Sequence, residues 1–166
     1  MLTEVVRLLS TPEAKTVGVA MLPIFELRGA IPMALLYLKM PVISAYLLSV
    51  CGNVVAIIPV LLFLGPVSNY LSRFRPFSRF FAWLFERSRK RSRLVERLEL
   101  LGLLLFVAIP LPMTGAWTGS VVAFLFDFGF VRSLTAISIG VLIAGIIVTV
   151  ATLFGWHVFI KPVCFL

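Results

Sequence analysis

The sequence predicts an all-α integral membrane protein with two inverted repeats, each a re-entrant helical hairpin plus a transmembrane helix, joined by a basic amphipathic connector. The first supporting observation is composition. Of the 166 residues, 61% are hydrophobic and 13% are charged, and the mean hydropathy is +1.10. Soluble domains carry about 25% charged residues, so a water-soluble globular enzyme is excluded.

The second observation is a repeated order of segments. In each half of the chain an interrupted apolar segment, a short turn and an uninterrupted apolar segment follow one another. Two-fold repeats with broken helices are typical of transporters. We therefore divide a single membrane domain, residues 1–166, into an interfacial helix (1–16), a first repeat (17–67), a basic connector (68–99) and a second repeat (100–160).

The N-terminal part contains the interfacial helix and the first repeat. Residues 1–16 mix charged and apolar side chains at a spacing that predicts a short helix on the membrane surface, ending near Pro12. The apolar segment that follows is interrupted at residues 26–32, which read Glu-Leu-Arg-Gly-Ala-Ile-Pro. Residues 42–67 are apolar and long enough to span a membrane.

The connector carries nearly all of the excess positive charge, which is the third observation. Between positions 73 and 97, nine Arg or Lys residues stand against two Glu residues, and aromatic residues are interleaved at helical spacing. Arg and Lys accumulate in cytoplasmic loops, so we place residues 73–97 in the cytoplasm, along the lipid headgroups. A basic cluster in a soluble protein could bind nucleic acid, but in this apolar chain we expect no such partner.

The second repeat begins with a segment that is too long for one simple crossing. Residues 100–130 are apolar but are interrupted at 110–119, which read Pro-Leu-Pro-Met-Thr-Gly-Ala-Trp-Thr-Gly. Pro110 and Pro112 lack backbone donors, so two helical arms that meet near the membrane midplane fit this length. Residues 134–160 form the second uninterrupted span.

The two interrupted segments are expected to be re-entrant. Irregular backbone inside a membrane is tolerated only where protein or a water-filled cavity covers it, so the hairpin tips should face each other inside the protein. If each hairpin returns to its own side, the first span makes the second hairpin enter from the opposite face, which inverts the repeats. The alternative is four full crossings, which Arg7, Lys15 and Lys161 favour under the positive-inside rule.

Glu26 and Arg28 give the clearest chemical signal. A charge at the bilayer centre costs about 2.5–3.5 kcal/mol, and two opposite charges can offset one another. On a regular helix, residues two positions apart point to different faces, whereas a non-helical loop can bring both around a common ligand. We expect Arg28 to bind an anionic group and Glu26 to carry a proton or a countercharge. The alternative is an internal ion pair that only locks the hairpin.

The other candidate site residues flank the two interruptions. A half-helix that begins after this charged pair would have Pro32 in its first turn, with free N–H groups facing an anion such as phosphate. In the second hairpin, Thr114 and Thr118 can cap the returning half-helix, and pure capping is the alternative to ligand binding. Trp117 lines the cavity or fills it. The candidate substrate-binding residues are Glu26, Arg28, Gly29, Pro32, Pro112, Thr114, Gly115, Trp117 and Thr118.

The sequence shows no pattern of a catalytic or metal centre. No Ser-His-Asp set, nucleophile elbow, phosphate-binding Gly-Lys-Ser/Thr loop or pair of catalytic carboxylates can be assembled, and the two Cys and one His lack metal-ligand spacing. We therefore expect no enzymatic activity, no metal and no cofactor. Asn53, inside the first span, is expected to be a hydrogen-bond partner between helices rather than a ligand.

The motifs at 26–32 and 110–119 resemble those of the small multi-drug export protein family of prokaryotes, over about residues 15–157. That family is similar in expected architecture to the DedA and SNARE-associated-Golgi-like membrane proteins, some of which move polyisoprenyl phosphate or phospholipids between leaflets. The longer acidic and proline motifs typical of DedA proteins are not present. The resemblance implies a transporter in the inner or plasma membrane of a prokaryotic cell.

These observations lead to three hypotheses of function. The first is a translocase that passes an anionic amphiphile, such as undecaprenyl phosphate or a phospholipid, through a midplane site, with Arg28 holding the phosphate and Glu26 coupling release to protonation. The second is a proton-coupled exporter of small cationic drugs that bind at Glu26. The third is a non-transporting scaffold. The expected partners are membrane lipids, an anionic lipid or small-molecule substrate, and a second copy of the chain in a homodimer.

Overall fold

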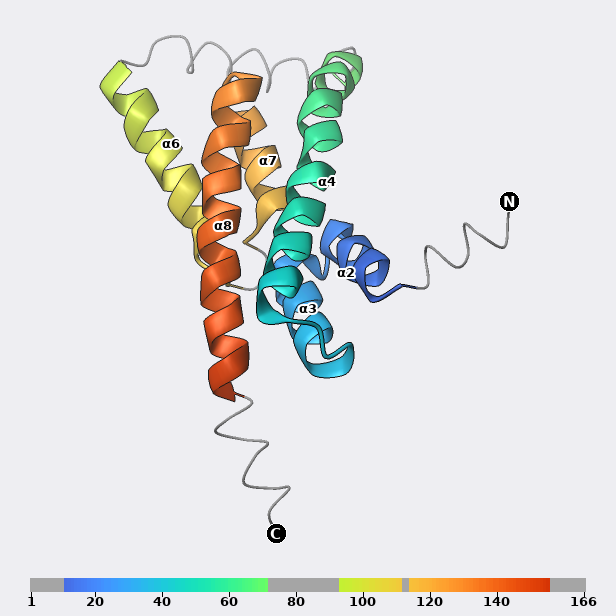
Figure 1. Cartoon of the computed structure of the whole chain (residues 1–166). Helices are drawn as coiled ribbons and strands as arrows, with labels where there is room; N and C mark the ends of the chain where they lie inside the picture. The colour runs from blue at the N-terminus through green and yellow to red at the C-terminus, as the bar shows by residue number, and fades with distance from the viewer. Residues whose placement is uncertain (1–10, 72–92, 112–113, 156–166) are drawn as a thin grey trace. The chain divides into compact units, whose positions relative to one another are not determined.

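The structure is a computed structural model that describes residues 11–71, 93–111 and 114–155 (Figure 1). Every regular element within these residues is helical, which confirms the predicted all-α class. The elements are α2 (Pro12–Met21), α3 (Glu26–Pro32), the π-helix η1 (Met33–Tyr37), α4 (Val42–Leu71), α6 (Arg93–Ala108), α7 (Ala116–Leu125) and α8 (Phe130–Gly155).

Two helices match the predicted spans. Residues Val42–Leu64 of α4, 23 residues, and the 26 residues of α8 have mean hydropathies of 2.5 and 2.6. Crossing a bilayer requires about 20 apolar residues, so both are long enough. Helix α8 begins at Phe130, four residues before the predicted start, and includes Arg132 in its first turn. By length and composition, both helices are therefore candidate membrane spans.

The chain forms two compact units. The first contains the described residues 11–55 and 141–155, and the second contains 56–71, 93–111 and 114–140. Each unit therefore combines one interrupted segment with parts of both long helices.

In the first unit, α2 starts where a helix was predicted to end. Pro12 is the first residue of α2, and the Oγ1 atom of Thr11 accepts a hydrogen bond from the N–H of Ala14 at 3.3 Å. The predicted interfacial helix falls mostly on residues 1–10 and stays a prediction, while residues 12–16 belong to α2. A hydroxyl residue followed by proline is a start signal, because the hydroxyl caps the helix and the proline ring fixes a helical φ without needing a donor. Residues 1–10 lie outside the described part of the chain.

The first interruption also lies earlier than predicted. The chain leaves regular helix at Leu22, whose ψ of 133° is extended, and α3 starts at Glu26, so the motif 26–32 is itself helical. Pro23 explains the position, since proline disfavours helix at the residue before it. Pro32 then cannot donate to the carbonyl four residues earlier, and the helix continues as the π-helix η1, in which Leu38 N–H donates to Met33 O at 3.1 Å.

The second unit contains a helical hairpin formed by α6 and α7, which run in opposite directions (Figure 1). With 16 and 10 residues, both helices are too short to cross a membrane alone, at about 1.5 Å per residue. The break between them was predicted at 110–119, and the structure confirms only its first part, because α7 starts at Ala116. The re-entrant and inverted placement of the hairpins stays a prediction.

Two glycines position α6 against its neighbours in the second unit. A Cβ added at Gly119 of α7 would lie 2.6 Å from Val107 Cγ2, and one added at Gly140 of α8 would lie 2.9 Å from Leu104 O. Such separations are far below van der Waals contact, so only glycine permits this approach. The deep end of α6 is therefore held tightly against both α7 and α8.

Candidate functional site

The first unit buries polar side chains on α3 and α4. Glu26, the first residue of α3, is 8% exposed, and Ser49 and Asn53, one turn apart on α4, are 0% and 1% exposed. Buried polar groups cost free energy unless they are hydrogen-bonded or paired, and they mark functional positions in membrane proteins. We refer to Glu26, Ser49 and Asn53 as the polar cluster.

The connection between η1 and α4 sets the register of these helices. A short turn reverses the chain between Tyr37 and Val42, so α3–η1 and α4 run in opposite directions (Figure 1). Ala34 of η1 and Ala45 of α4, both fully buried, belong to one apolar cluster with Met40. Both helices therefore contribute buried residues to the same apolar cluster.

Ala30 and Glu26 lie four and eight residues before Ala34, and Ser49 and Asn53 lie four and eight residues after Ala45. All four residues are buried, and i, i+4 residues of an α-helix share a face. The polar cluster therefore lies on buried faces of α3 and α4 within the first unit.

Ser49 differs from the other buried hydroxyl residues of the described chain. Each of those donates to a carbonyl one turn earlier: Thr16 to Pro12 O at 2.8 Å, Ser120 to Ala116 O at 2.8 Å, Ser133 to Gly129 O at 3.2 Å and Thr149 to Gly145 O at 2.7 Å. This is the usual way to satisfy a hydroxyl in an apolar helix. Within the described residues, Ser49 Oγ makes no such bond and no other hydrogen bond.

Asn53 shows the same feature. Its Oδ1 atom is buried and accepts no hydrogen bond from any described residue, and its predicted role as a hydrogen-bond partner between helices stays a prediction. Nearly all buried polar atoms in folded proteins are paired, so two unpaired oxygens on adjacent turns point to a ligand. Sequence analysis missed Ser49, although a Ser and an Asn four residues apart in an apolar span are a usable signal.

Glu26 also has an unusual backbone conformation. Its φ of 45° lies in the left-handed region, which non-glycine residues rarely adopt. Lys39 and Asp127 share this conformation, with φ of 51° and 53°, but both follow a helix end, where it is a common cap. At Glu26 the left-handed conformation instead occurs at the first residue of a helix, α3. Residues held in such conformations are concentrated at functional sites.

The relation between Glu26 and Arg28 is not the predicted one. Both lie on the helix α3, where the prediction had placed them in a non-helical loop, and Arg28 is half-buried. Pro32 is the last residue of α3 rather than a first-turn residue. A Cβ at Gly29 would lie 2.8 Å from Phe25 Cβ, so Gly29 accommodates the Phe25 side chain at the break.

In the second unit, Thr114 stabilises the hairpin tip. Its Oγ1 atom accepts from Leu111 N–H at 3.1 Å and lies 2.8 Å from Ile109 O. The N-cap of α7 is Gly115, and Thr118 lies inside the first turn and donates to Gly115 O at 3.2 Å, so neither threonine is the N-cap residue.

The remaining candidates of the second unit are Trp117, which lies in the first turn of α7 and is half-buried, and Pro112, which lies outside the described residues. The candidates from the two hairpins belong to different units, so their convergence on one site stays a prediction. Within the described part of the chain, no group of three or more His, Cys, Asp or Glu side chains could hold a metal ion.

Comparison with known proteins assigns the chain to a protein family. Residues 26–147, most of the chain, match the model of the family described as Putative small multi-drug export protein. The chain belongs to this family. The match starts at Glu26 and includes α3, α4 and the α6–α7 hairpin. No curated protein and no solved structure matches the chain. The family assignment and the two apolar helices together support a membrane exporter, without indicating its substrate.

Proposed function

We propose that this chain exports small cationic amphiphiles across a prokaryotic inner membrane in exchange for protons, with the polar cluster as the binding site. The observation that carries the proposal is the pair of buried oxygens without a hydrogen-bond partner, Ser49 Oγ and Asn53 Oδ1, in the same unit as the buried Glu26. The family of exporters to which the chain belongs supports the same direction.

The chemistry of the polar cluster suits a cation. A carboxylate sheltered from water is neutralised either by a proton or by a bound cation, so the two compete for Glu26. A substrate cation pairs with Glu26 while N–H groups of the substrate donate to Ser49 Oγ and Asn53 Oδ1. Leu27 and Ile31, buried alkyl side chains on the same helix as Glu26, suit an apolar substrate body.

A translocase of an anionic amphiphile, such as undecaprenyl phosphate or a phospholipid, is the second candidate. It is favoured by Arg28, a half-buried guanidinium on α3, because the planar guanidinium is well suited to phosphate. It ranks second because α3 begins at Glu26, so a carboxylate occupies the place where a helix N-terminus was expected to receive the phosphate.

The topology belongs to the same proposal. The basic residues at 73–97 place the connector in the cytoplasm, and both hairpins are re-entrant, entering from opposite faces. Two spans and two hairpins offer little material to enclose a pathway, so we include a homodimer. Residues 72–92 lie outside the described part of the chain.

The test uses proteoliposomes with an imposed pH gradient and ethidium as the cationic probe. Glu26→Gln should lower ethidium efflux at least about tenfold, and Asn53→Ala about threefold, as expected for losing a charged and a neutral hydrogen-bond partner. Glu13→Gln, which changes an exposed carboxylate on α2, is the matched control and should leave efflux unchanged. Helix content and gel-filtration profile of each variant report folding.

A second assay separates the two candidates. Leaflet transfer of a fluorescent polyisoprenyl phosphate that is lost in Arg28→Ala, with no ethidium efflux from the unmodified chain, would replace the exporter by the translocase. If Glu26→Gln and Arg28→Ala change neither flux, both transport proposals fail and a scaffold role gains support.

A further inference from the structure

A second binding surface lies in the second unit, between α6 and the start of α8. The groove there has a cavity volume of about 400 Å³, within the range of small-molecule sites. The residues that form it fall into pairs that are each 35 positions apart: Arg97 with Arg132, Leu101 with Ala136, and Leu104 with Ile139. A constant offset means that the two helices run in the same direction along the groove. We refer to it as the α6–α8 groove.

The groove is polar at one end and apolar along the rest. Its two charged lining residues, Arg97 and Arg132, lie at the end where both helices begin. Leu104 and Ile139 are seven residues further along, about 10 Å deeper at the rise of an α-helix. The Thr135 hydroxyl donates to Arg132 O at 3.0 Å, so it is satisfied by its own helix. The groove therefore changes from charged to apolar with depth, as a lipid leaflet changes from headgroups to acyl chains.

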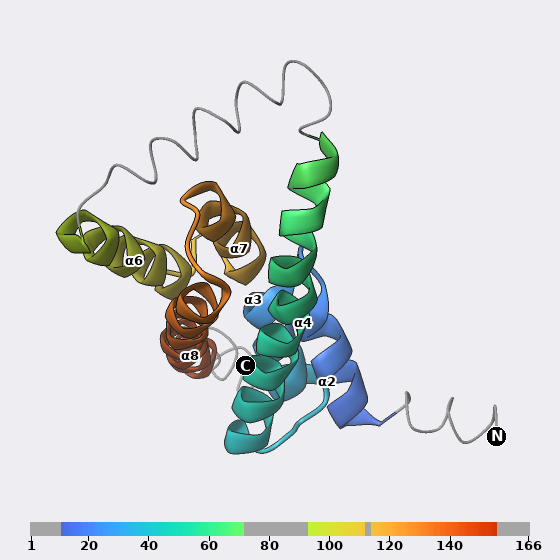
Figure 2. The ribbon, with the colours of Figure 1, turned by 90° about the horizontal axis from the view of Figure 1, so that it is seen from above.

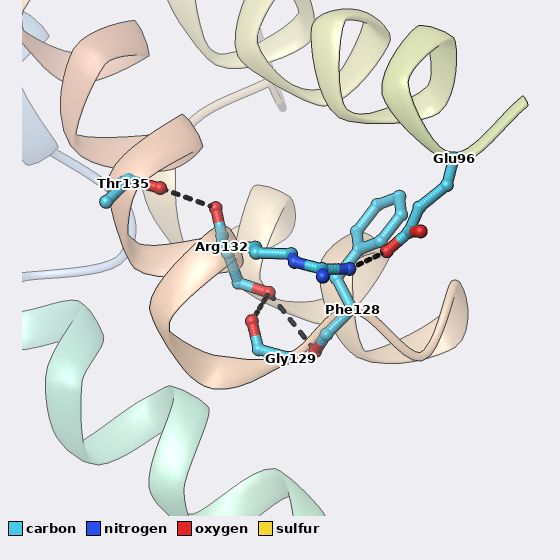
Figure 3. A network of polar contacts seen from close by, with 6 residues as sticks. Glu96, Phe128, Gly129, Arg132 and Thr135 are labelled. Atoms are coloured by element: carbon cyan, nitrogen blue, oxygen red, sulfur yellow. Dashed lines mark hydrogen bonds and ion pairs between the residues drawn. The ribbon is translucent and has the colours of Figure 1, made fainter. Parts of the chain in front are cut away.

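The groove has a closed end and an open end. At the deep end, Gly140 brings α8 against Leu104 O and the Val107 side chain, so the helices touch. Toward its start, α6 leans away from α8 in both views (Figures 1 and 2). An ion pair between Arg132 and Glu96 bridges the gap at the open end (Figure 3). Arg132 remains 62% exposed, and its five N–H donors exceed what one carboxylate oxygen uses.

The position of Arg132 along α8 indicates which part of the membrane surrounds the groove. Arg132 is the third residue of α8, at the start of a membrane-spanning segment, where arginine side chains meet lipid headgroups. Below it, Leu101 and Ile139 are exposed apolar side chains, 56% and 47%, as expected for residues facing acyl chains. The groove therefore opens to lipid at headgroup depth.

From this geometry we infer that the α6–α8 groove binds one anionic phospholipid, with its phosphate on Arg97 and Arg132 and an acyl chain along Leu101 and Leu104. The positive charge of the lining residues indicates which class of molecule occupies the groove. The lining contains two arginines and no carboxylate, and Glu96 pairs with Arg132, so an apolar helix packed here would cover Arg97 without supplying a counter-charge, which is costly. An anionic headgroup supplies the missing charge. This site is separate from the polar cluster, and its test does not depend on transport.

The test measures lipids that remain bound to the purified full chain after solubilisation from an equal mixture of phosphatidylglycerol and phosphatidylcholine, by native mass spectrometry. The unmodified chain should retain phosphatidylglycerol preferentially. Arg97→Gln with Arg132→Gln should lower that preference about tenfold, because each arginine near a membrane surface contributes severalfold. Arg97→Lys with Arg132→Lys keeps the charge and should keep the preference within about twofold.

Three single variants sharpen the test. Thr135→Trp fills the groove from an exposed position and should abolish retention of both lipids, whereas Val131→Trp, exposed on the same helix outside the groove lining, should not. Glu96→Gln removes the carboxylate that competes for Arg132 and should raise phosphatidylglycerol retention about twofold.

Three results would overturn the inference: equal retention of both lipids by the unmodified chain, lipid retained by Thr135→Trp, or a dimer that this variant dissociates. Helix content of each variant verifies that it is folded.

Discussion

The two interrupted segments are broken by the same means and then used differently. Pro23 lies in the first break, and Pro110 lies in the second. After the first break, α3 opens with a buried carboxylate in a left-handed conformation. After the second, α7 opens with Gly115 and small residues that pack closely. Proline thus determines where a helix is interrupted, and the residues that follow determine whether the break binds a ligand or packs helices.

The largest expected effect tests this difference directly. Glu26→Gln should lower proton-driven ethidium efflux at least about tenfold, because a charged partner contributes roughly 1.5–3 kcal/mol. Thr114→Val, which removes the hydroxyl that stabilises the second tip, should change efflux by less than about threefold. Equal losses in the two variants would show that both breaks carry the chemistry.

The membrane topology of the chain provides the second test of the comparison between the two interrupted segments. After replacement of the two native cysteines, Lys39→Cys and Val131→Cys report the turns that follow each interrupted segment. Two re-entrant hairpins predict labelling from opposite sides of the membrane by a thiol reagent that does not cross it. Labelling from the same side would instead establish four full crossings and remove the inverted repeat.

Packing of the second segment predicts a smaller effect on stability. Gly119→Ala places a Cβ 2.6 Å from Val107 Cγ2 and should lower the free energy of unfolding by about 1–3 kcal/mol. Gly102→Ala on α6 is the matched control, because no atom lies within 4 Å of its added Cβ. It should be neutral or stabilising by up to about 1 kcal/mol. Thermal unfolding in detergent compares them, and equal destabilisation would contradict the close approach.

The smallest effect differs in sign between two serines. Ser120→Ala removes a hydroxyl bonded to Ala116 O and should cost about 0.5 kcal/mol. Ser49→Ala removes a buried hydroxyl without a partner among the described residues, so it should raise the free energy of unfolding by up to about 1 kcal/mol while weakening ethidium efflux. A destabilised Ser49→Ala would indicate that this hydroxyl has a structural role.

Much of the fold followed from the sequence because its signals are local. Long apolar runs predicted α4 and α8, and Pro110 predicted the second break. The error at residues 26–32 arose because this segment was interpreted by its polar and helix-breaking residues. The structure shows that helix forms there, and after Pro32 the backbone hydrogen bonds continue in a π-helical pattern.

The site was predicted in part. Glu26 was identified because a charge in an apolar segment is conspicuous in any sequence. Ser49 was not, because a serine in a membrane helix normally bonds to its own backbone, and only the geometry shows that this one does not. The α6–α8 groove was not predicted either, since Arg97 and Arg132 are far apart in the chain.

The sequence by itself predicted a helical membrane protein and the approximate positions at which its helices break. These properties depend on the transfer of side chains from water to lipid and on proline, and both effects act residue by residue. Tertiary structure alone decided that Glu26 and Asn53 are buried, that Ser49 Oγ has no hydrogen-bond partner among the described residues, and that two arginines line the same groove. Those features depend on helix register and on glycine contacts between helices, which no single segment encodes.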